Sequence, residues 1–265
     1  MAREAIKERT LIYIQQNKHT IIMKILVCIS HVPDTTTKIQ FKDNKLDTTG
    51  VQFIIGPYDD YALARAVEIA TETSGSVTVL NVGTADTEPT IRKALAIGAD
   101  DAIRVDAEPT DAMFVAKQIV EVAKKENYDM ILMGRESSDF NGGLVHGMVA
   151  EMLGIPSVAP TMRLDLEGNT ATLEREIEGG KEVLKLQTPF VAGCQEPIAE
   201  WKIPNMRGIM SARKKPLQVV PAVEAENVTA YESFELPASK GDCKMVEPDQ
   251  MGELVRMLKE DAKVL

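Results

Sequence analysis

Residues 129–154 read DMILMGRESSDFNGGLVHGMVAEMLG, and this stretch decides the fold class. The apolar run Met130–Met133 is short and uninterrupted, as in a strand that is buried on both faces. It ends at Gly134, and a polar loop of small residues follows. The segment Gly142–Leu153 then has helical spacing and stops at Gly154, a residue type that commonly ends helices. The stretch therefore predicts one strand–loop–helix unit.

The chain before this unit repeats the same alternation. The further strands share a short apolar run, and they are Ile25–Ile29, Ser76–Leu80 and Asp101–Val105. The further helices share an apolar face or a capping residue, and they are a helix opened by Pro57, Thr87–Ile97 closed by Gly98, and a helix from Thr110 or Asp111 to about Lys125. Such repetition predicts an α/β fold with a doubly wound, mostly parallel, Rossmann-like sheet of the adenine nucleotide-binding type.

The chain changes character after residue 156. The segment Ser157–Ala192 has no long helical pattern and predicts several antiparallel strands that extend or flank the sheet. Gly179-Gly180 is predicted to form a hairpin turn, because glycine adopts positive φ without steric cost. Beyond Cys194 the chain is predicted to be extended as far as a last helix near residues 248–262. We expect an antiparallel extension and a C-terminal arm.

These patterns suggest three parts within the 265 residues. Residues 1–22 lack the features of a secretory signal and are interpreted as an N-terminal extension. Residues 23–220 are expected to form the nucleotide-binding α/β domain. Residues 221–265 are expected to form a C-terminal arm with a terminal helix, suited to embracing a partner subunit.

Composition narrows the possible functions. The net charge is −10 and aromatic residues make up 5% of the chain, which argues against a nucleic-acid-binding surface. The three cysteines have no CxxC spacing, which suits a reducing cytoplasm and argues against a cysteine-based metal site or a disulfide scaffold. No apolar run is long enough to span a membrane. We therefore expect a cytoplasmic protein without membrane insertion.

Three predicted strand ends are candidate ligand sites, because doubly wound sheets bind ligands beyond the carboxyl ends of their strands. They are Cys28–Asp34, Asn81–Thr84 and Gly134–Gly143. The third has accessible backbone N–H groups ahead of a helix, where the helix dipole favours a phosphate. A polar loop whose glycines only satisfy turn geometry is an equally weighted alternative at this point.

Candidate catalytic side chains are few. The histidines are His19, His31 and His146, and none belongs to a recognisable catalytic motif. Asp59-Asp60 and Asp100-Asp101 are interpreted as helix-start and turn residues. We therefore expect no catalytic residue and no metal site, so that a bound cofactor would carry any reaction.

Four segments resemble electron transfer flavoprotein β subunits, and residues 23–220 follow that family closely. The segments are KILVCISHVPD (24–34), IRKALAIGAD (91–100), REIEGGKEVLKLQTP (175–189) and IPNMRGIMSARKKP (203–216). The loop Gly134–Gly143 stands where the family binds a nucleotide phosphate. Two departures are Gly56-Pro57 in place of Asn-Pro, and the phosphate loop itself.

The resemblance implies a small subunit of a heterodimer that carries electrons. An α subunit would hold most of a shared FAD, and this chain would hold AMP, or a second FAD in a bifurcating member. The implied nucleotide contacts are Cys28, Gly56, Pro57, Tyr58, Asp59, Val82, Gly134, Arg135, Glu136, Ser137, Ser138, Asp139, Phe140, Asn141, Gly142 and Gly143.

The resemblance also implies partners. Glu176 would face the flavin domain of the α subunit, and Ile203, flanked by Lys202 and Pro204, would dock acyl-CoA or other flavin dehydrogenases. The electrons would pass to a quinone reductase or another acceptor. Two alternatives remain, a stand-alone adenine-nucleotide-binding stress protein without a partner, and an adenylating enzyme of the same architecture.

Overall fold

The computed structural model describes residues 22–239 and 241–265, and these residues fall into two compact units. The larger unit comprises residues up to Lys38 together with Thr48–Glu232. The smaller unit comprises Ile39–Asp47 and the chain from Ser233 to Leu265. The extension expected at residues 1–22 lies outside the described residues, except for Ile22.

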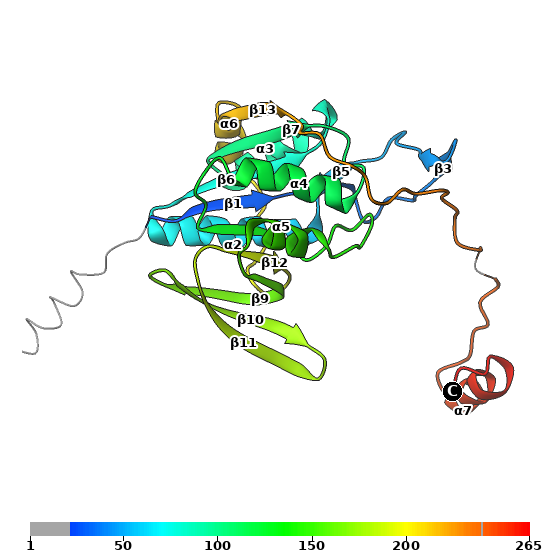
Figure 1. Ribbon diagram of the computed structural model, residues 1–265. Coiled ribbons are helices and arrows are strands. Elements are labelled where there is room, and N and C mark those ends of the chain that lie inside the picture. The colour runs from blue at the N-terminus through cyan, green and yellow to red at the C-terminus, as the bar shows by residue number, and fades with distance from the viewer. Residues whose placement is uncertain (1–21, 240) are drawn as a thin grey trace, which may run out of the picture. The chain divides into compact units, whose positions relative to one another are not determined.

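A nine-stranded sheet forms the centre of the larger unit in the described part of the chain (Figure 1). The strands, in their order across the sheet, are β11 (Gly180–Gln187), β10 (Thr170–Ile177), β9 (Ser157–Glu167), β12 (Phe190–Cys194), β8 (Met130–Gly134), β1 (Lys24–Cys28), β6 (Ser76–Val82), β7 (Asp101–Asp106) and β13 (Leu217–Pro221). The pairs from β9 to β13 are parallel, whereas β9–β10 and β10–β11 are antiparallel. The predicted doubly wound sheet with an antiparallel extension is confirmed.

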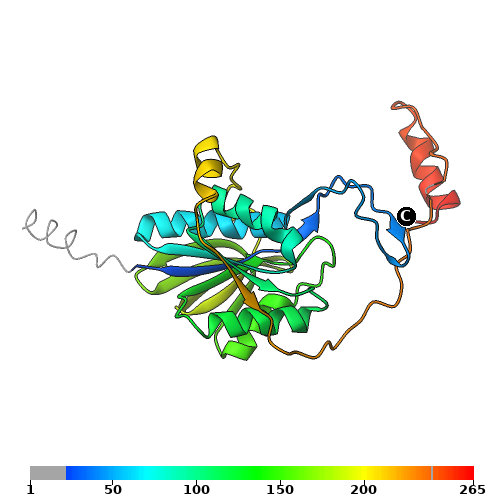
Figure 2. The same cartoon turned by 90° about the horizontal axis from the view of Figure 1, so that it is seen from above.

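Helices cover both faces of this sheet (Figure 2). One face carries α2 (Pro57–Thr73), α3 (Glu88–Ile97) and α6 (Met206–Ala212), and the other carries α4 (Ala112–Ala123) and α5 (Val145–Leu153). In strand β1 the four residues after Lys24 are all apolar and all buried. Ile25 and Val27 pack with residues of α2, whereas Leu26 and Cys28 pack with residues of α4. Both faces of the strand are therefore buried.

Shorter elements surround this framework. The strand β2 (His31–Pro33) pairs with β5 (Phe53–Ile55), and the 3-10 turn η1 (Ala85–Thr87) precedes α3. Among the helices of the described residues, none combines the length and the apolar character that crossing a membrane requires.

The hairpin turn lies one residue earlier than predicted. Ile177 pairs with Gly180, so the two turn residues are Glu178 and Gly179, and Gly180 already belongs to β11. Gly179 has φ +79°, the left-handed region, while Gly180 does not. A two-residue turn needs the left-handed glycine, and the register of the strands decides which of two adjacent glycines takes that place.

The helix after β8 begins at Val145 instead of Gly142. Asn141 and Gly143 both have positive φ, at +50° and +59°, which a right-handed helix cannot contain. The loop that precedes α5 is therefore longer than expected.

The chain beyond Cys194 is not simply extended, because α6 and β13 were missed. Asn205 caps α6 by accepting from the backbone N–H of Gly208 at 2.8 Å. The basic residue Lys215 donates to the carbonyls of Leu95 and Ala99, at 2.9 and 2.5 Å, which fastens the start of β13 to the end of α3. Tertiary contacts order this segment, although its composition indicates a solvated tail.

The smaller unit pairs a short hairpin with the C-terminal part of the chain. The strands β3 (Phe41–Lys42) and β4 (Lys45–Leu46) form the hairpin. The ring of Phe41 stacks on Phe234 with 5.2 Å between centroids, and the N–H of Phe234 donates to Asn44 at 2.8 Å. The helix α7 (Met251–Arg256) continues into a π-helical turn, η2 (Met257–Asp261), as predicted for residues 248–262.

Candidate functional site

The three strand ends singled out in the sequence meet at one edge of the sheet. β1 lies between β6 and β8, and all three run parallel. The N–H of Ile29 donates to the carbonyl of Leu80 at 2.9 Å, and the amide of Asn81 donates to the carbonyl of Ile29, also at 2.9 Å. The chain order reverses at β1, with β6 on one side and β8 on the other. This is the switch point at which open α/β sheets bind ligands.

The carboxylate of Asp59, in the first turn of α2, joins two of these strand ends. One oxygen accepts from the backbone N–H and the hydroxyl of Ser30, at 2.8 and 2.5 Å, and the other accepts from the N–H of Gly134 at 2.7 Å. Asp59 is 5% exposed, and burial raises its pKa to about 6 against the opposing effect of these hydrogen bonds. The sequence analysis interpreted Asp59 as a helix-start residue and did not predict that its carboxylate joins two strand ends.

Gly134 is required by the close approach of α2 to the end of β8. An added Cβ would lie 2.6 Å from a carboxylate oxygen of Asp59 and 2.8 Å from the Cβ of Tyr58. Gly56 stands in the same tight corner, where a Cβ would overlap Ser30 and Asp59. Two glycines therefore allow the start of α2 to reach the strand ends.

The loop that follows, residues 135–144, is open to solvent where a phosphate is predicted. A Cβ built at Gly142 meets nothing within 4 Å. The α5 helix has no side-chain cap at its N-terminus, so its first N–H groups point into this region without a side-chain acceptor. Asn141 and Gly143 have positive φ, and Asn141 and Gly142 are exposed. These features fit an anion held by backbone N–H groups.

The predicted contacts at the other two strand ends are largely buried. Cys28 and Val82 are 7% and 8% exposed, and burial raises the pKa of the Cys28 thiol well above its usual value. Beside Val82, the Oδ1 atom of Asn81 is buried without a hydrogen-bond donor in the described part of the chain. A polar acceptor left unsatisfied at this edge is consistent with an amino or hydroxyl donor on a ligand.

Arg135 connects the loop with the hairpin of β10 and β11. Its guanidinium donates to Glu136 at 2.9 Å and to Gln195 at 2.9 Å, and it lies 4.9 Å from the centre of the Tyr58 ring. The amide of Gln195 in turn donates to Glu176 at 2.8 Å. The predicted nucleotide loop and the predicted flavin-facing carboxylate thus belong to one polar network.

Gln195 is a site residue that the sequence analysis missed, and Ser30 was included only as part of the candidate strand end Cys28–Asp34. Each directly follows or lies close behind the carboxyl end of a parallel strand, β1 and β12 respectively. The strand-end rule applies to both. It would have identified Gln195 had the strand Phe190–Cys194 been predicted as parallel.

Two histidines of the described chain have packing roles at this edge. The Nδ1 atom of His31 lies 2.8 Å from the hydroxyl of Thr90, and its ring stacks on Phe53 at 4.4 Å. His146 packs near Gly193, where an added Cβ would come within 2.9 Å of the imidazole. Burial lowers the pKa of both histidines. His19 lies outside the described residues.

The segment around Ile203 carries an exposed apolar surface. Ile203 is 76% exposed, so its side chain is not tucked beneath the loop. The other large exposed apolar side chains of this loop and α6 are Trp201, Met206, Ile209 and Met210. We call these five residues the apolar patch. Exposed apolar groups gathered on one short segment are typical of a docking site.

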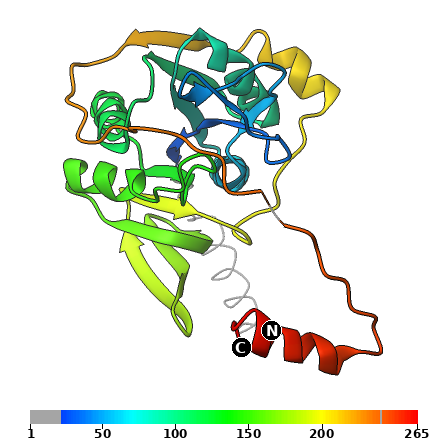
Figure 3. The ribbon, with the colours of Figure 1, turned by 90° about the vertical axis from the view of Figure 1, so that its right-hand side faces the viewer.

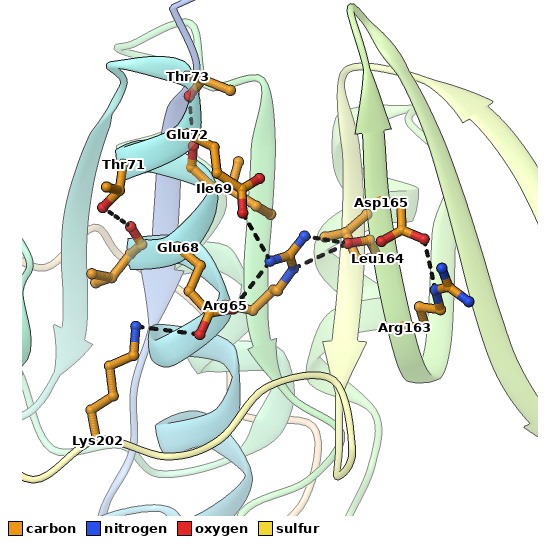
Figure 4. A network of polar contacts seen from close by, with 11 residues as sticks. Arg65, Glu68, Ile69, Thr71, Glu72, Thr73, Arg163, Leu164, Asp165 and Lys202 are labelled. Carbon is orange, nitrogen blue, oxygen red and sulfur yellow. Dashed lines mark hydrogen bonds and ion pairs between the residues drawn. The ribbon is translucent and has the colours of Figure 1, made fainter.

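Lys202 fixes this loop to α2 (Figure 4). Its ammonium group lies 3.3 Å from Glu68, which also pairs with Arg65 at 3.1 Å. Arg65 donates twice to the carbonyl of Leu164 in β9, at 3.0 and 2.7 Å. The loop that carries Ile203 and the antiparallel extension are therefore both attached to the same helix.

The comparisons with known proteins agree with this arrangement. The model of the electron transfer flavoprotein domain matches residues 43–225. The chain is 31% identical to electron transfer flavoprotein subunit beta of Bacillus subtilis over 258 residues, which cover 92% of this chain and 100% of that protein. The protein of the same name from Syntrophomonas wolfei is 35% identical over 82% of this chain and 87% of its own length. The human one is 30% identical over 91% of this chain and 99% of its own length. The chain therefore belongs to the family of electron transfer flavoprotein β subunits.

Proposed function

We propose that this protein is the β subunit of a heterodimeric electron transfer flavoprotein in a bacterial cytoplasm. In this proposal an α-type subunit holds most of a shared FAD, and this chain holds AMP. Electrons pass from acyl-CoA or other flavin dehydrogenases to a quinone reductase or another acceptor. Bound FAD would supply the redox chemistry, so this chain acts as a carrier subunit and not as an enzyme in its own right.

The loop between β8 and α5 is the observation that carries the proposal. It lies at the switch point of a parallel sheet, and its backbone is open at the uncapped N-terminus of α5. Gly142 and Gly143 would hold the phosphate through backbone N–H groups, and Asn141 through its side-chain amide, because the backbone N–H of Asn141 donates to the carbonyl of Ser137 at 2.9 Å. Residues 56–59 would approach the nucleotide from the start of α2.

The polar network of Arg135, Gln195 and Glu176 gives the hairpin a place in this function. Glu176 is exposed on β10, and its carboxylate is oriented by the amide of Gln195. A carboxylate held in this way can pair with a basic group on the flavin domain of an α subunit without first losing side-chain freedom. Arg135 fixes the other end of Gln195, so the nucleotide loop supports the orientation of Glu176.

The alternatives make different use of these features. A stand-alone stress protein would have no use for an oriented carboxylate on a hairpin or for the apolar patch. A bifurcating-type subunit would hold a second FAD where AMP is proposed, and the loop around Gly142, where an added Cβ meets nothing within 4 Å, would leave room for the phosphate of either nucleotide. An adenylating enzyme would require a metal-binding carboxylate set beside the loop.

Nucleotide analysis of the heterodimer tests the proposal. The chain should be co-expressed with a candidate α-type subunit, purified as a complex, denatured, and its released nucleotides separated by chromatography. We expect one FAD and one AMP per heterodimer. Two FAD and no AMP would show that a second flavin is bound in place of AMP. A monomer that binds ATP and does not bind the α-type subunit would contradict the proposal.

Ile203→Asp should weaken the reaction with a dehydrogenase without affecting assembly. A charge at a buried docking anchor costs about 2 kcal/mol, so we expect kcat/KM for reduction by an acyl-CoA dehydrogenase to fall roughly 30-fold. Ile22→Asp is the matched control, because Ile22 is 70% exposed and lies outside the apolar patch. Equal rates for the two variants would exclude Ile203 as the anchor.

A further inference from the structure

The segment that follows β13 crosses α4 in an extended conformation and reaches the loop that follows β8. We call residues 222–231 the strap, and Figure 3 shows this orange segment passing beside α4. Gln118 of α4 fixes its first part. The side-chain amide donates to the carbonyl of Val223 at 2.9 Å, and its oxygen accepts from the N–H of Val223 at 2.8 Å. Gln118 is 1% exposed, so the strap satisfies a buried polar group.

Asp111 fixes the middle of the strap. One carboxylate oxygen accepts from the N–H of Phe114 at 2.6 Å and so caps α4. The other accepts from the N–H groups of Val228 and Thr229, at 2.6 and 2.9 Å. The same carboxylate therefore begins the helix and holds the strap, which gives the strap a defined path over the surface.

The strap ends with Tyr231 on the candidate nucleotide loop. The rings of Tyr231 and Phe140 stack with 4.7 Å between centroids and 21° between planes. The backbone N–H groups of Phe140 and Asn141 donate to the side chain of Asp139 and to the carbonyl of Ser137, both within the loop itself. The aromatic stack is thus a contact between the loop and a distant part of the sequence.

The stack bears on a loop whose backbone contains two left-handed residues, Asn141 at φ +50° and Gly143 at φ +59°. Asparagine enters this region more easily than other non-glycine residues, but still less readily than the right-handed region, so contacts with the surroundings help to hold it there. A Cβ built on the neighbouring Gly142 would meet nothing within 4 Å, so no other segment packs against that side of the loop. If the loop leaves this conformation for part of the time, binding weakens in proportion to the population that is lost.

We propose that Tyr231 is a positioning residue of the nucleotide site, and that the strap holds residues 137–143 in their binding conformation through the stack on Phe140. This inference rests on the proposed function, since it assumes that the loop binds the nucleotide phosphate. It adds a part of the site that lies almost 90 residues further along the sequence than the loop.

The experiment measures nucleotide release from the purified heterodimer. The complex is loaded with radiolabelled AMP, and the loss of label is followed during a chase with unlabelled AMP. Tyr231→Ala should release AMP about three- to tenfold faster, whereas Tyr231→Phe, which keeps the ring, should stay within about twofold of the unaltered complex. Thr229→Ala is a control that should also stay within about twofold, because the backbone hydrogen bonds to Asp111 remain and only the long 3.4 Å contact of the Thr229 hydroxyl is removed.

A double variant separates positioning from a general loss of stability. Phe140→Ala should accelerate release as Tyr231→Ala does, and the two changes together should be no worse than either alone, because both remove one contact. Additive effects, or unchanged release in Tyr231→Ala, would overturn the role of the strap. An unaltered complex that retains no AMP would instead overturn the proposed AMP site, on which the inference rests.

Discussion

Gly134→Ala is expected to destabilise the larger unit by roughly 3 kcal/mol and to abolish nucleotide retention. The new Cβ would lie 2.6 Å from the carboxylate of Asp59 and 3.0 Å from its backbone nitrogen. Those atoms belong to the start of α2, which cannot move away without breaking the hydrogen bonds of Asp59 to Ser30 and to Gly134 itself. The substitution therefore forces either an overlap or the loss of a buried charge-assisted hydrogen bond.

Gly142→Ala provides the matched control for this prediction. The same methyl group at Gly142 meets nothing within 4 Å, and the residue has no positive φ. Its free energy of unfolding should stay within about 0.5 kcal/mol of that of the unaltered protein. Urea-induced unfolding followed by circular dichroism would measure both variants. Equal stability of the two alanine variants would show that α2 does not approach β8 as closely as described.

The alternation of strands and helices could be predicted because it depends on local patterns. Continuous apolar runs such as Met130–Met133 need burial on both faces, and only a sheet with helices on both sides provides it. Pro57 opens α2, and Asp111 caps α4, as their residue types suggest. These features are written in a few neighbouring residues, so the fold class follows from them.

The remaining features depend on contacts between distant segments. Asp59 could face solvent, or it could lie buried between Ser30 and Gly134. The outcome depends on how closely α2 approaches β8, which no local pattern specifies. The same holds for Gln195, which bonds Arg135 and Glu176 from two other elements. The turn before β13, which pairs with β7, is held by hydrogen bonds of Lys215 and Arg92 to segments far away in the sequence. The sequence predicted a loop at residues 134–143 between a strand and a helix, and the binding of a nucleotide there remains a prediction.

The unfolding free energy is expected to depend on pH through Asp59. Its pKa is raised from 3.8 to about 6, mainly because burial disfavours the charged form. Between these values Asp59 binds more protons in the folded protein than in the unfolded chain, so its contribution to stability falls as pH rises from about 4 to about 6 and is constant above. Two pKa units correspond to a loss of about 3 kcal/mol over this range.

Asp59→Asn should remove this part of the pH dependence, because an amide does not ionise. Its carbonyl oxygen can still accept from one of the two backbone N–H groups, whereas Asp59→Ala leaves both without an acceptor and should cost about 3 kcal/mol at pH 5. Asp60, whose pKa is also raised to about 6 mainly by burial, contributes with the same sign. The comparison variant Asp60→Asn should therefore remove only the part of the pH dependence of the unfolding free energy that is due to Asp60.

Urea midpoints measured from pH 4.5 to pH 8 for the unaltered protein and the two asparagine variants distinguish the contributions. If the slope below pH 6 survives unchanged in Asp59→Asn, the carboxylate does not lie in the buried junction. A slope that is reduced in Asp59→Asn to the part due to Asp60, together with retained nucleotide, would show that the junction of Ser30, Asp59 and Gly134 tolerates a neutral group. Its function would then be to join the strand ends, and the charge itself would be a cost to stability at neutral pH.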